Sequence, residues 1–215
     1  MEEMVKAEAN PQEAPFFVSL VESAIDELDR RGLIHRDRVG ITGFSRTAYH
    51  GEYLLTHSKY PFGAAVIADG IDLGFVNCVL YPLFNSFCEK MNGGLPWGDS
   101  LASWEKESPP MRLDKMHAPL LLQAISGPIA EWEIYAGLRW LKKPVELVNF
   151  YPEGTHELVR PQQKLLSHQS AVDWCCFWLK GEEDPDPGKA EQYKRWRGLR
   201  ELQAANEKSG GKGSY

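Results

Sequence analysis

The sequence predicts an α/β fold, with a mainly parallel sheet of about four strands flanked by helices. Short apolar runs alternate along the chain with longer segments in which apolar residues recur at helical spacing. Two of these runs, residues 64–68 and 119–125, are almost entirely apolar, as expected for strands covered by helices on both faces. Strands that alternate with helices pair in parallel through right-handed crossovers. The carboxyl ends of the strands therefore share one edge of the sheet, where reactive side chains collect in such folds.

Each element follows from a local pattern of apolar residues and breakers. The expected strands are residues 39–44, 64–68, 119–125 and 145–150. The expected helices run from Ala14 to a C-cap at Gly32, from Ser45 to about His57, from about Asn77 to Met91, and over residues 130–141, 161–180 and 189–207. Glycines and prolines surround Leu101 to Lys106, which is expected to be a loop with one helical turn or two.

The chain divides into one domain and two flanking segments. Residues 1–13 are polar and expected to be loose, residues 14–181 form the domain, and residues 182–215 comprise a linker, a charged helix and a flexible tail. The expected core residues of the last two domain helices are Trp132, Tyr135, Leu138 and Trp140, followed by Trp174, Phe177, Trp178 and Leu179.

Composition excludes several classes of protein. The hydrophobic content of 43% and charged content of 25% are ordinary for a globular chain of 215 residues. The net charge of −6 argues against nucleic acid or an anionic membrane as a partner. No apolar run is long enough to span a bilayer, and the acidic N-terminus is unlike a signal peptide, so a cytoplasmic location is expected by default.

The four cysteines show no metal-ligand spacing, and we expect neither a metal nor another cofactor. Cys175 and Cys176 are adjacent, and Cys78 and Cys88 lie elsewhere in the chain. Free and mostly buried thiols are therefore the expected state of all four.

The strand at 39–44 leads into a serine at the start of a helix. The order strand, Gly43-Phe44-Ser45, helix is the context of a nucleophile elbow, in which a strained turn pushes the serine hydroxyl out of the backbone. Four of the five positions of Gly-x-Ser-x-Gly are present, with Thr47 in the last. The alternative is a serine that only caps a helix, since serine is a preferred N-cap residue.

His156 follows the last predicted strand in a loop, which places it at the same edge of the sheet as Ser45. A histidine suits the role of the base that takes the proton of a serine hydroxyl. Ser45 precedes His156 in the chain, the order that an α/β-hydrolase requires. The other five histidines lie on predicted helices or connections, without this placement. On its own, His156 would be interpreted as an exposed loop residue.

These motifs carry a resemblance to a known family. The stretches concerned are residues 37–45 (DRVGITGFS), 107–109 (ESP), 115–122 (KMHAPLLL), 143–147 (KPVEL) and 151–156 (YPEGTH). Over roughly residues 15–180 the chain resembles the C-terminal part of the α/β-hydrolase domain of prolyl oligopeptidase (S9) family peptidases. The resemblance implies a partial α/β-hydrolase fold, with Ser45 as nucleophile and His156 as base. It also implies acyl transfer on a peptide or similar acyl substrate.

The family's catalytic acid has no counterpart at its usual place. In the family an aspartate follows the strand at 119–125, but this chain has Ser126, Gly127 and Pro128 there. Glu131 is the nearest carboxylate in sequence, and Asp69 or Asp72, after the preceding strand, are alternatives. Glu131 could also be simply a first-turn residue favoured by the helix dipole.

Two further departures bear on activity. Thr47 replaces a glycine of the elbow, and the chain starts at the helix before the elbow strand. The resemblance implies about four further strands ahead of it, one of whose loops supplies an oxyanion donor, and a β-propeller gate. The backbone N–H of Arg46 would then be the only donor, and losing one donor costs about 10²–10³ in rate. We therefore expect weak or no activity from this chain, as for a fragment of a longer protein.

Three functions remain open from the sequence. The first is a serine hydrolase of peptidase type, the second is a non-catalytic α/β-hydrolase-like module that binds peptides or another subunit, and the third is an esterase for small acyl esters. Trp97 and Trp104 could furnish an apolar pocket. The open edge of the strand at 39–44 is expected to favour self-association, because unpaired edge strands pair with other chains.

Overall fold

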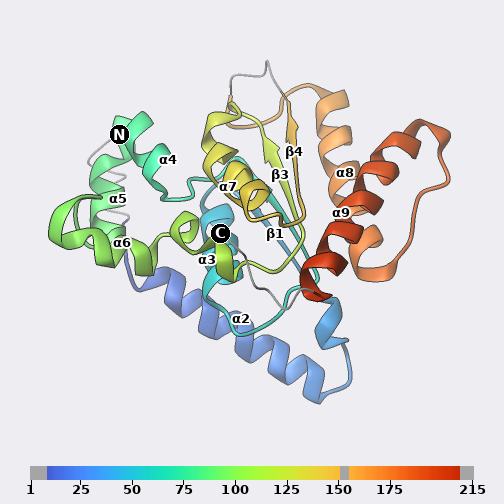
Figure 1. Ribbon diagram of the computed structural model, residues 1–215, viewed down its shortest axis with the longest axis horizontal. Coiled ribbons are helices and arrows are strands. Elements are labelled where there is room, and N and C mark those ends of the chain that lie inside the picture. Colours follow the sequence, from blue (N-terminus) through green and yellow to red (C-terminus); the bar gives the residue numbers. More distant parts are fainter. Residues whose placement is uncertain (1–8, 151–154, 209–215) are drawn as a thin grey trace.

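The computed structural model describes residues 9–150 and 155–208. One sheet of four parallel strands has the order β1-β2-β3-β4. Its strands are β1 (Gly40–Phe44), β2 (Ala64–Ala68), β3 (Leu120–Ala124) and β4 (Val145–Asn149). Helices lie on both sides of the sheet (Figure 1), so the predicted fold class and the four strands are confirmed.

The core on one face of the sheet is formed with α3 (Arg46–His57) and α7 (Ile129–Trp140). Ala65 and Ile67 of β2 belong to this core, while the intervening Val66 belongs to the core on the opposite face. This alternation follows from the two-residue period of a strand and explains why β2 is apolar throughout.

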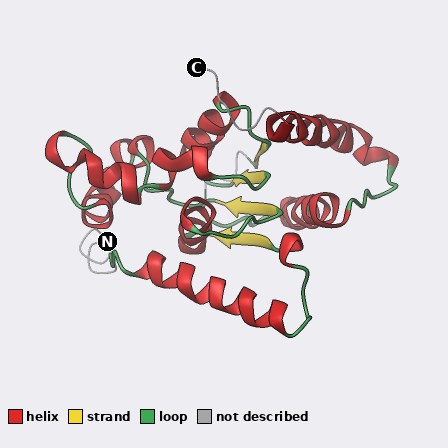
Figure 2. Cartoon of the chain, turned by 60° about the horizontal axis from the view of Figure 1, so that its bottom comes forward, coloured by secondary structure: helices red, strands yellow, loops and turns green. Residues whose placement is uncertain are grey.

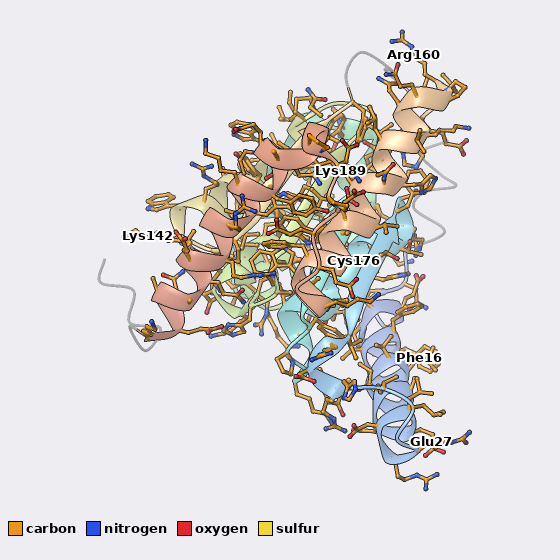
Figure 3. The ribbon with its side chains drawn as sticks, turned by 90° about the vertical axis from the view of Figure 1, so that its right-hand side faces the viewer. Phe16, Glu27, Lys142, Arg160, Cys176 and Lys189 are labelled. Atoms are coloured by element: carbon orange, nitrogen blue, oxygen red, sulfur yellow. A yellow bond between two sulfur atoms is a disulfide. The ribbon has the colours of Figure 1, made fainter. Side chains whose placement is uncertain are left out.

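The opposite face is covered by α8 (Pro161–Lys180) and α9 (Ala190–Lys208). Four aromatic side chains, Trp174, Phe177, Tyr193 and Trp196, fill the space between these helices and the sheet. Lys189 lies directly before α9 (Figure 3) and forms an ion pair with Asp173 of α8 at 2.8 Å. The charged C-terminal helix is thus fastened to the domain by an aromatic core and an ion pair. Of the N-terminal segment expected to be loose, residues 1–13, the first eight lie outside the described residues, while Ala9 is buried and Glu13 begins the helix α2 (Glu13–Arg30). The expected flexible tail, from residue 209, also lies outside the described residues.

The β1 side of the sheet is the least covered. β1 pairs only with β2 among the described strands, and α2 (Glu13–Arg30) runs beside this side of the sheet (Figure 2). Val18 and Val21 of α2 pack against the core that α3 shares. Phe44 at the end of β1 remains 39% exposed.

The prediction of one helix over residues 77–91 is wrong, because the chain forms two shorter helices there. These are α4 (Phe75–Leu80) and α5 (Asn85–Asn92), separated by the 3-10 turn Pro82–Phe84. Pro82 has no backbone N–H and cannot continue a helix. Short helical pieces cover the rest of this region and the two other connections: α6 (Leu101–Glu107) and the 3-10 segments Arg36–Arg38, Gly98–Ser100, Pro109–Lys115 and Pro187–Lys189.

The expectation of four free thiols is wrong for two of them. Cys78 on α4 and Cys88 on α5 form a disulfide, while Cys175 and Cys176 on α8 are free. The turn at Pro82 folds α5 back against α4, which brings the two Cα atoms to 6.0 Å. A single continuous helix would have kept these residues apart.

Two aromatic residues of α7 expected in the core are also exposed. Trp132 is 52% and Trp140 is 86% exposed, whereas Leu138 is buried. The buried face of α7 instead carries Ala130, Ile134 and Leu138, spaced by four residues. Trp132 and Trp140 share the opposite face, because they too are separated by multiples of four residues.

Candidate active site

Ser45 lies at the turn between β1 and α3, with φ 56° and ψ −125°. A positive φ is a strained conformation for a residue with a side chain. The turn is tight because a Cβ at Gly43 would lie 2.4 Å from the carbonyl oxygen of Thr47, so only glycine fits there. Ser45 makes no side-chain cap to α3, which contradicts the interpretation of this residue as a simple N-cap.

Thr47 closes the turn in a way that glycine could not. Its hydroxyl accepts a hydrogen bond from the Phe44 N–H at 2.9 Å and lies 2.8 Å from the Phe44 carbonyl oxygen. The backbone groups of the last β1 residue are thereby satisfied by a side chain. This departure from the elbow pattern leaves the strand-to-helix turn intact.

His156 reaches Ser45 from the far side of the sheet. Its Nε2 atom lies 2.7 Å from Ser45 Oγ. The imidazole stacks on the ring of Phe44 with a centroid distance of 4.8 Å. Its side chain is 52% exposed, so water and a substrate can reach the pair.

Asp69 completes a continuous chain of hydrogen bonds. Its Oδ2 atom lies 2.8 Å from His156 Nδ1. Its Oδ1 atom accepts bonds from the backbone N–H groups of Ile125 and Ser126, at 2.9 and 2.7 Å, and from the Ser126 hydroxyl at 2.9 Å. Asp69 is buried and directly follows β2, whereas its donors directly follow β3. The pairing of two neighbouring strands thus fixes the carboxylate.

A cavity of about 390 Å³ opens beside Ser45. Its lining includes Tyr81, Phe84 and Phe87, which we call the aromatic wall, together with Tyr49 and Ile71. The two tryptophans expected to furnish a pocket lie elsewhere: Trp97 is exposed and Trp104 is buried, and neither lines this cavity. The sequence signal for the wall was missed, because its three aromatic residues fall in a segment interpreted as one helix.

Known proteins were compared with this chain by sequence. No family model matches. The chain is 33% identical to the lasso peptide isopeptidase AtxE2 of Asticcacaulis excentricus over 184 residues, which is 85% of the chain and 26% of that protein. It is 25% identical to dipeptidyl-peptidase 5 of Porphyromonas endodontalis over 170 residues, 74% of the chain and 24% of that protein.

Solved structures that resemble this chain belong to the same kinds of protein as the relatives found by sequence. An AtxE2 isopeptidase variant with Astexin3-dC4 bound matches 93% of this chain and 31% of its own, at 30% identity and a TM-score of 0.77. The acylaminoacyl peptidase of Pyrococcus horikoshii matches 81% of this chain and 29% of its own in fold, at 21% identity and a TM-score of 0.60. These relatives are S9-family peptidases. The chain matches part of their α/β-hydrolase domain and spans about a quarter of the length of the curated relatives.

The carboxylate that contacts the imidazole lies at a different place from the one that the S9 resemblance implies. Of the three carboxylates that the sequence left open, only Asp69 contacts the imidazole. Glu131, named first, accepts a hydrogen bond from the Gly70 N–H at 3.0 Å and makes no bond to His156. Asp72 accepts from the Gly74 N–H at 2.7 Å. The register between β2 and β3 determines which carboxylate reaches the imidazole, because it brings the end of β2, where Asp69 lies, next to the end of β3.

Glu131 and Asp72 belong to a buried acidic cluster with Glu52, which the sequence did not indicate. Burial raises the pKa of Glu131 well above its usual range, although the Gly70 N–H opposes this. Burial likewise raises the pKa of Asp72 to about 8, and the pKa of the fully buried Glu52 is raised for the same reason. Burial therefore favours the protonated form of all three groups.

Arg46 contributes to the site in two ways. It is the first residue of α3, so its backbone N–H lies at a helix N-terminus directly after Ser45, where an oxyanion donor is expected. Its guanidinium lines the cavity and donates from Nε to Glu13 of α2 at 3.1 Å. Arg46 lowers the pKa of Glu13, chiefly through this side-chain hydrogen bonding. The link between α2 and the cavity was not predicted.

Within residues 9–150 and 155–208, no group of three or more His, Cys, Asp or Glu side chains is arranged to hold a metal ion. In the same part of the chain, no helix is long and apolar enough to cross a bilayer.

Proposed function

We propose that this chain carries the nucleophile, the base and the acid of a serine-type peptidase. The observation that supports this best is the unbroken series Asp69 Oδ2, His156 Nδ1, His156 Nε2 and Ser45 Oγ, with distances of 2.8 and 2.7 Å. Three groups in this order form the arrangement that activates a serine hydroxyl on several unrelated folds. Asp69 takes the place of the acid, so the triad draws on the ends of β1, β2 and the loop after β4.

The proposed reaction is acyl transfer in two halves. His156 Nε2 accepts the hydroxyl proton as Ser45 Oγ attacks the substrate carbonyl carbon, and the carbonyl oxygen becomes an oxyanion beside the Arg46 N–H. Asp69 stabilises the imidazolium, which then gives its proton to the leaving amine as the C–N bond breaks. A water molecule, deprotonated by His156, attacks the acyl-serine, and the returning proton restores the Ser45 hydroxyl.

The proposed substrate is a peptide whose acyl side chain is apolar. The cavity beside Ser45 offers aromatic and aliphatic side chains rather than charged ones over most of its lining, and Arg46 there is bonded to Glu13. A lasso peptide isopeptide bond is a second candidate, favoured by the 33% identity to the AtxE2 isopeptidase. Esters of small acids could use the same three groups, and a module that only binds peptides would keep the cavity without needing the triad.

We propose that turnover by this chain alone is slow and that it self-associates through β1. Arg46 supplies one oxyanion donor, and the loss of a second donor lowers the rate about 10²–10³-fold. The outer edge of β1 has no strand partner among the described residues, and the exposed Phe44 lies at its end. Such an edge pairs readily with another chain.

The location proposed for the chain is an oxidising compartment rather than the cytoplasm expected by default. The observation is the Cys78–Cys88 disulfide, a bond that cytosolic reductants rarely allow to persist. Trapping of thiols with iodoacetamide in whole cells, followed by mass spectrometry, checks this. An alkylated Cys78 in freshly lysed cells would contradict it.

A fluorophosphonate probe tests the central assignment. The probe phosphonylates an activated serine and should label the wild-type chain at Ser45, as located by peptide mass spectrometry. The Ser45→Ala variant should not react, and Ser23→Ala, a control serine variant at an exposed position on α2, should still react. Absence of labelling in a folded wild-type chain would favour the non-catalytic module.

A further inference from the structure

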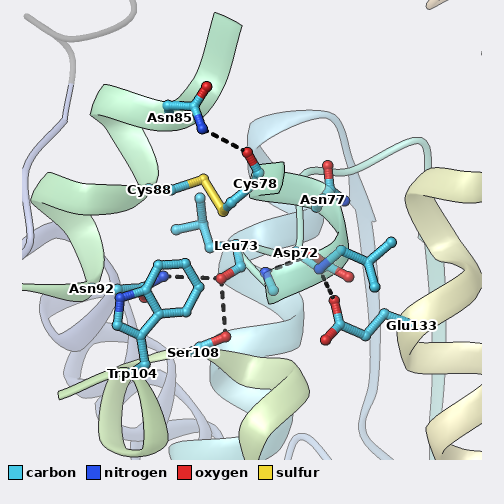
Figure 4. Close-up of a disulfide and its surroundings, with 12 residues drawn as sticks. Asp72, Leu73, Asn77, Cys78, Asn85, Cys88, Asn92, Trp104, Ser108 and Glu133 are labelled. Atoms are coloured by element: carbon cyan, nitrogen blue, oxygen red, sulfur yellow. Dashed lines mark hydrogen bonds between the residues drawn. A yellow bond between two sulfur atoms is a disulfide. The ribbon is translucent and has the colours of Figure 1, made fainter. Parts of the chain in front are cut away.

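The aromatic wall of the cavity lies inside the loop that the disulfide closes. Cys78 and Cys88 are ten residues apart, and Tyr81, Phe84 and Phe87 all fall between them. Figure 4 shows the disulfide joining α4 to α5, with Asn85 bonded to the Cys78 carbonyl oxygen at 3.0 Å. The covalent bond therefore spans the turn on which the wall is built.

The two ends of this segment are held by the rest of the domain. Near its start, Asn77 donates to the Ala130 carbonyl oxygen at 3.0 Å, and the Val76 N–H donates to Glu133 at 2.8 Å. At its far end, Asn92 donates to the Leu73 carbonyl oxygen at 3.0 Å. These bonds anchor the segment at its base and do not fix the turn between.

The helices on either side of the turn are short. α4 has six residues and α5 has eight, lengths at which a helix is unstable without packing. Val79 and Leu80, next to the turn, are 42% and 52% exposed. Phe87 is buried beside the disulfide and Phe84 packs against the same core cluster, whereas the two arms of the turn are joined to each other by the disulfide and the Asn85 bond. The position of the wall therefore depends in part on the disulfide.

We propose that the Cys78–Cys88 disulfide positions the aromatic wall and thereby sets the affinity of the cavity for apolar acyl side chains. The role in substrate choice rests on the proposed function of Ser45, whereas the role in shaping the cavity does not. The disulfide lies in a core cluster with Phe87, Leu73 and Trp104 that is separate from the clusters on the two faces of the sheet. Removing it should therefore loosen the wall and leave the sheet folded.

The test compares three chains that all carry Ser45→Ala, so that no result depends on catalysis. The first has no other change, the second also carries Cys78→Ala and Cys88→Ala, and the third carries Cys175→Ala and Cys176→Ala as a matched cysteine control on α8. N-acetyl-phenylalaninamide and N-acetyl-alaninamide serve as probes in NMR titrations. Amide hydrogen exchange is followed over residues 75–92 and, for comparison, over β2 and β3.

Without the disulfide, we expect binding of the phenylalanine probe to weaken about tenfold, roughly 1.4 kcal/mol, with little change for the alanine probe. Exchange over residues 75–92 should rise at least tenfold, β2 and β3 should stay protected, and the α8 variant should match the parent. Unchanged phenylalanine affinity or exchange in a folded disulfide-free chain would overturn the proposal.

A second preparation covers the case in which the alanine variant does not fold. The parent chain is refolded and kept in tris(2-carboxyethyl)phosphine, which reduces the disulfide to two thiols while the phosphine becomes its oxide with oxygen from water. It should show the same loss of phenylalanine affinity. Loss of the far-ultraviolet circular dichroism in both preparations would also overturn the proposal, because the disulfide would then hold the whole domain. If the parent binds the phenylalanine probe but wild-type Ser45 never reacts with fluorophosphonate, the proposed function fails and the wall's role stands.

Discussion

The triad and the aromatic wall face one cavity, yet they are held in different ways. Ser45 and Asp69 directly follow neighbouring strands, and the backbone after β3 fixes the Asp69 carboxylate with two N–H groups. The wall lies on a turn between two short helices that a disulfide closes. Sheet register can place reactive atoms within tenths of an ångström, whereas a turn can change its length and sequence freely. In the proposed function, the chemistry is therefore built into the sheet, and substrate choice is left to the segment that the disulfide closes.

One substitution in each region should affect a different quantity: the labelling rate of Ser45 or the affinity for the probe. His156→Ala should slow fluorophosphonate labelling of Ser45 by about 10⁴-fold, because no base remains to take the hydroxyl proton. Phe84→Ala should change the labelling rate at saturating probe by less than about threefold while weakening binding of a phenylalkyl probe, since it removes only packing area. The measurement is the rate as a function of probe concentration. If Phe84→Ala lowered the limiting rate as much as His156→Ala, the separation of the two regions would be wrong.

The buried acids beneath the site should make stability depend on pH. Burial raises the pKa of Asp72 from 3.8 to about 8, so the folded chain holds a proton that the unfolded chain releases at lower pH. The stabilising effect is complete below pH 3.8 and is lost as the pH rises toward 8. Asp72→Asn should remove this dependence. The free energy of unfolding of the variant minus that of the wild type should therefore be about 1–3 kcal/mol larger at pH 8 than at pH 5.

Urea unfolding at pH 5 and pH 8 provides the measurement for Asp72→Asn. Asp99→Asn, at an exposed position, is the control and should keep the wild-type pH dependence. If the free energy of unfolding changed by the same amount between pH 5 and pH 8 in the wild type and in both variants, the assignment of a protonated Asp72 would be wrong.

The smallest predicted effect is on self-association through the open edge of β1. Thr42 is exposed in the middle of β1, and a lysine there should oppose pairing with a second chain. Thr42→Lys should weaken self-association about tenfold, as seen by sedimentation velocity over a range of concentrations. Ala205→Lys, at an exposed position on α9, adds the same charge away from β1 and should leave association unchanged. A wild-type chain that stays monomeric at every concentration would show that the edge is already protected.

Most of the fold and the proximity of Ser45 and His156 could be predicted, because their signals are local. The apolar runs of β2 and β3 each need only a few residues, and Gly43, Ser45 and the following helix form one continuous motif. The position of His156 after the last strand follows from the order of the elements. Such features depend on neighbours in sequence, and parallel pairing brings strand ends together.

The remaining features depend on contacts between distant segments. Three carboxylates could have reached His156, and the register between β2 and β3 decides for Asp69. Helical periodicity identifies the faces of α7 without showing which one the sheet covers, so Trp132 and Trp140 were misplaced. The disulfide and the wall both follow from the turn at Pro82, whose direction the local pattern does not give.

The most direct test of the account compares two carboxylates. Second-order rate constants for fluorophosphonate labelling of Ser45 are measured at pH 7.5 for the wild type, Asp69→Asn and Glu131→Gln. Asp69→Asn should be about 10³–10⁴-fold slower, because an amide cannot stabilise the imidazolium of His156. Glu131→Gln should stay within about fivefold of the wild type, since Glu131 is expected to be protonated and its bond to Gly70 can be kept by an amide oxygen. Equal effects, or a larger loss for Glu131→Gln, would contradict the assignment of Asp69 as the acid.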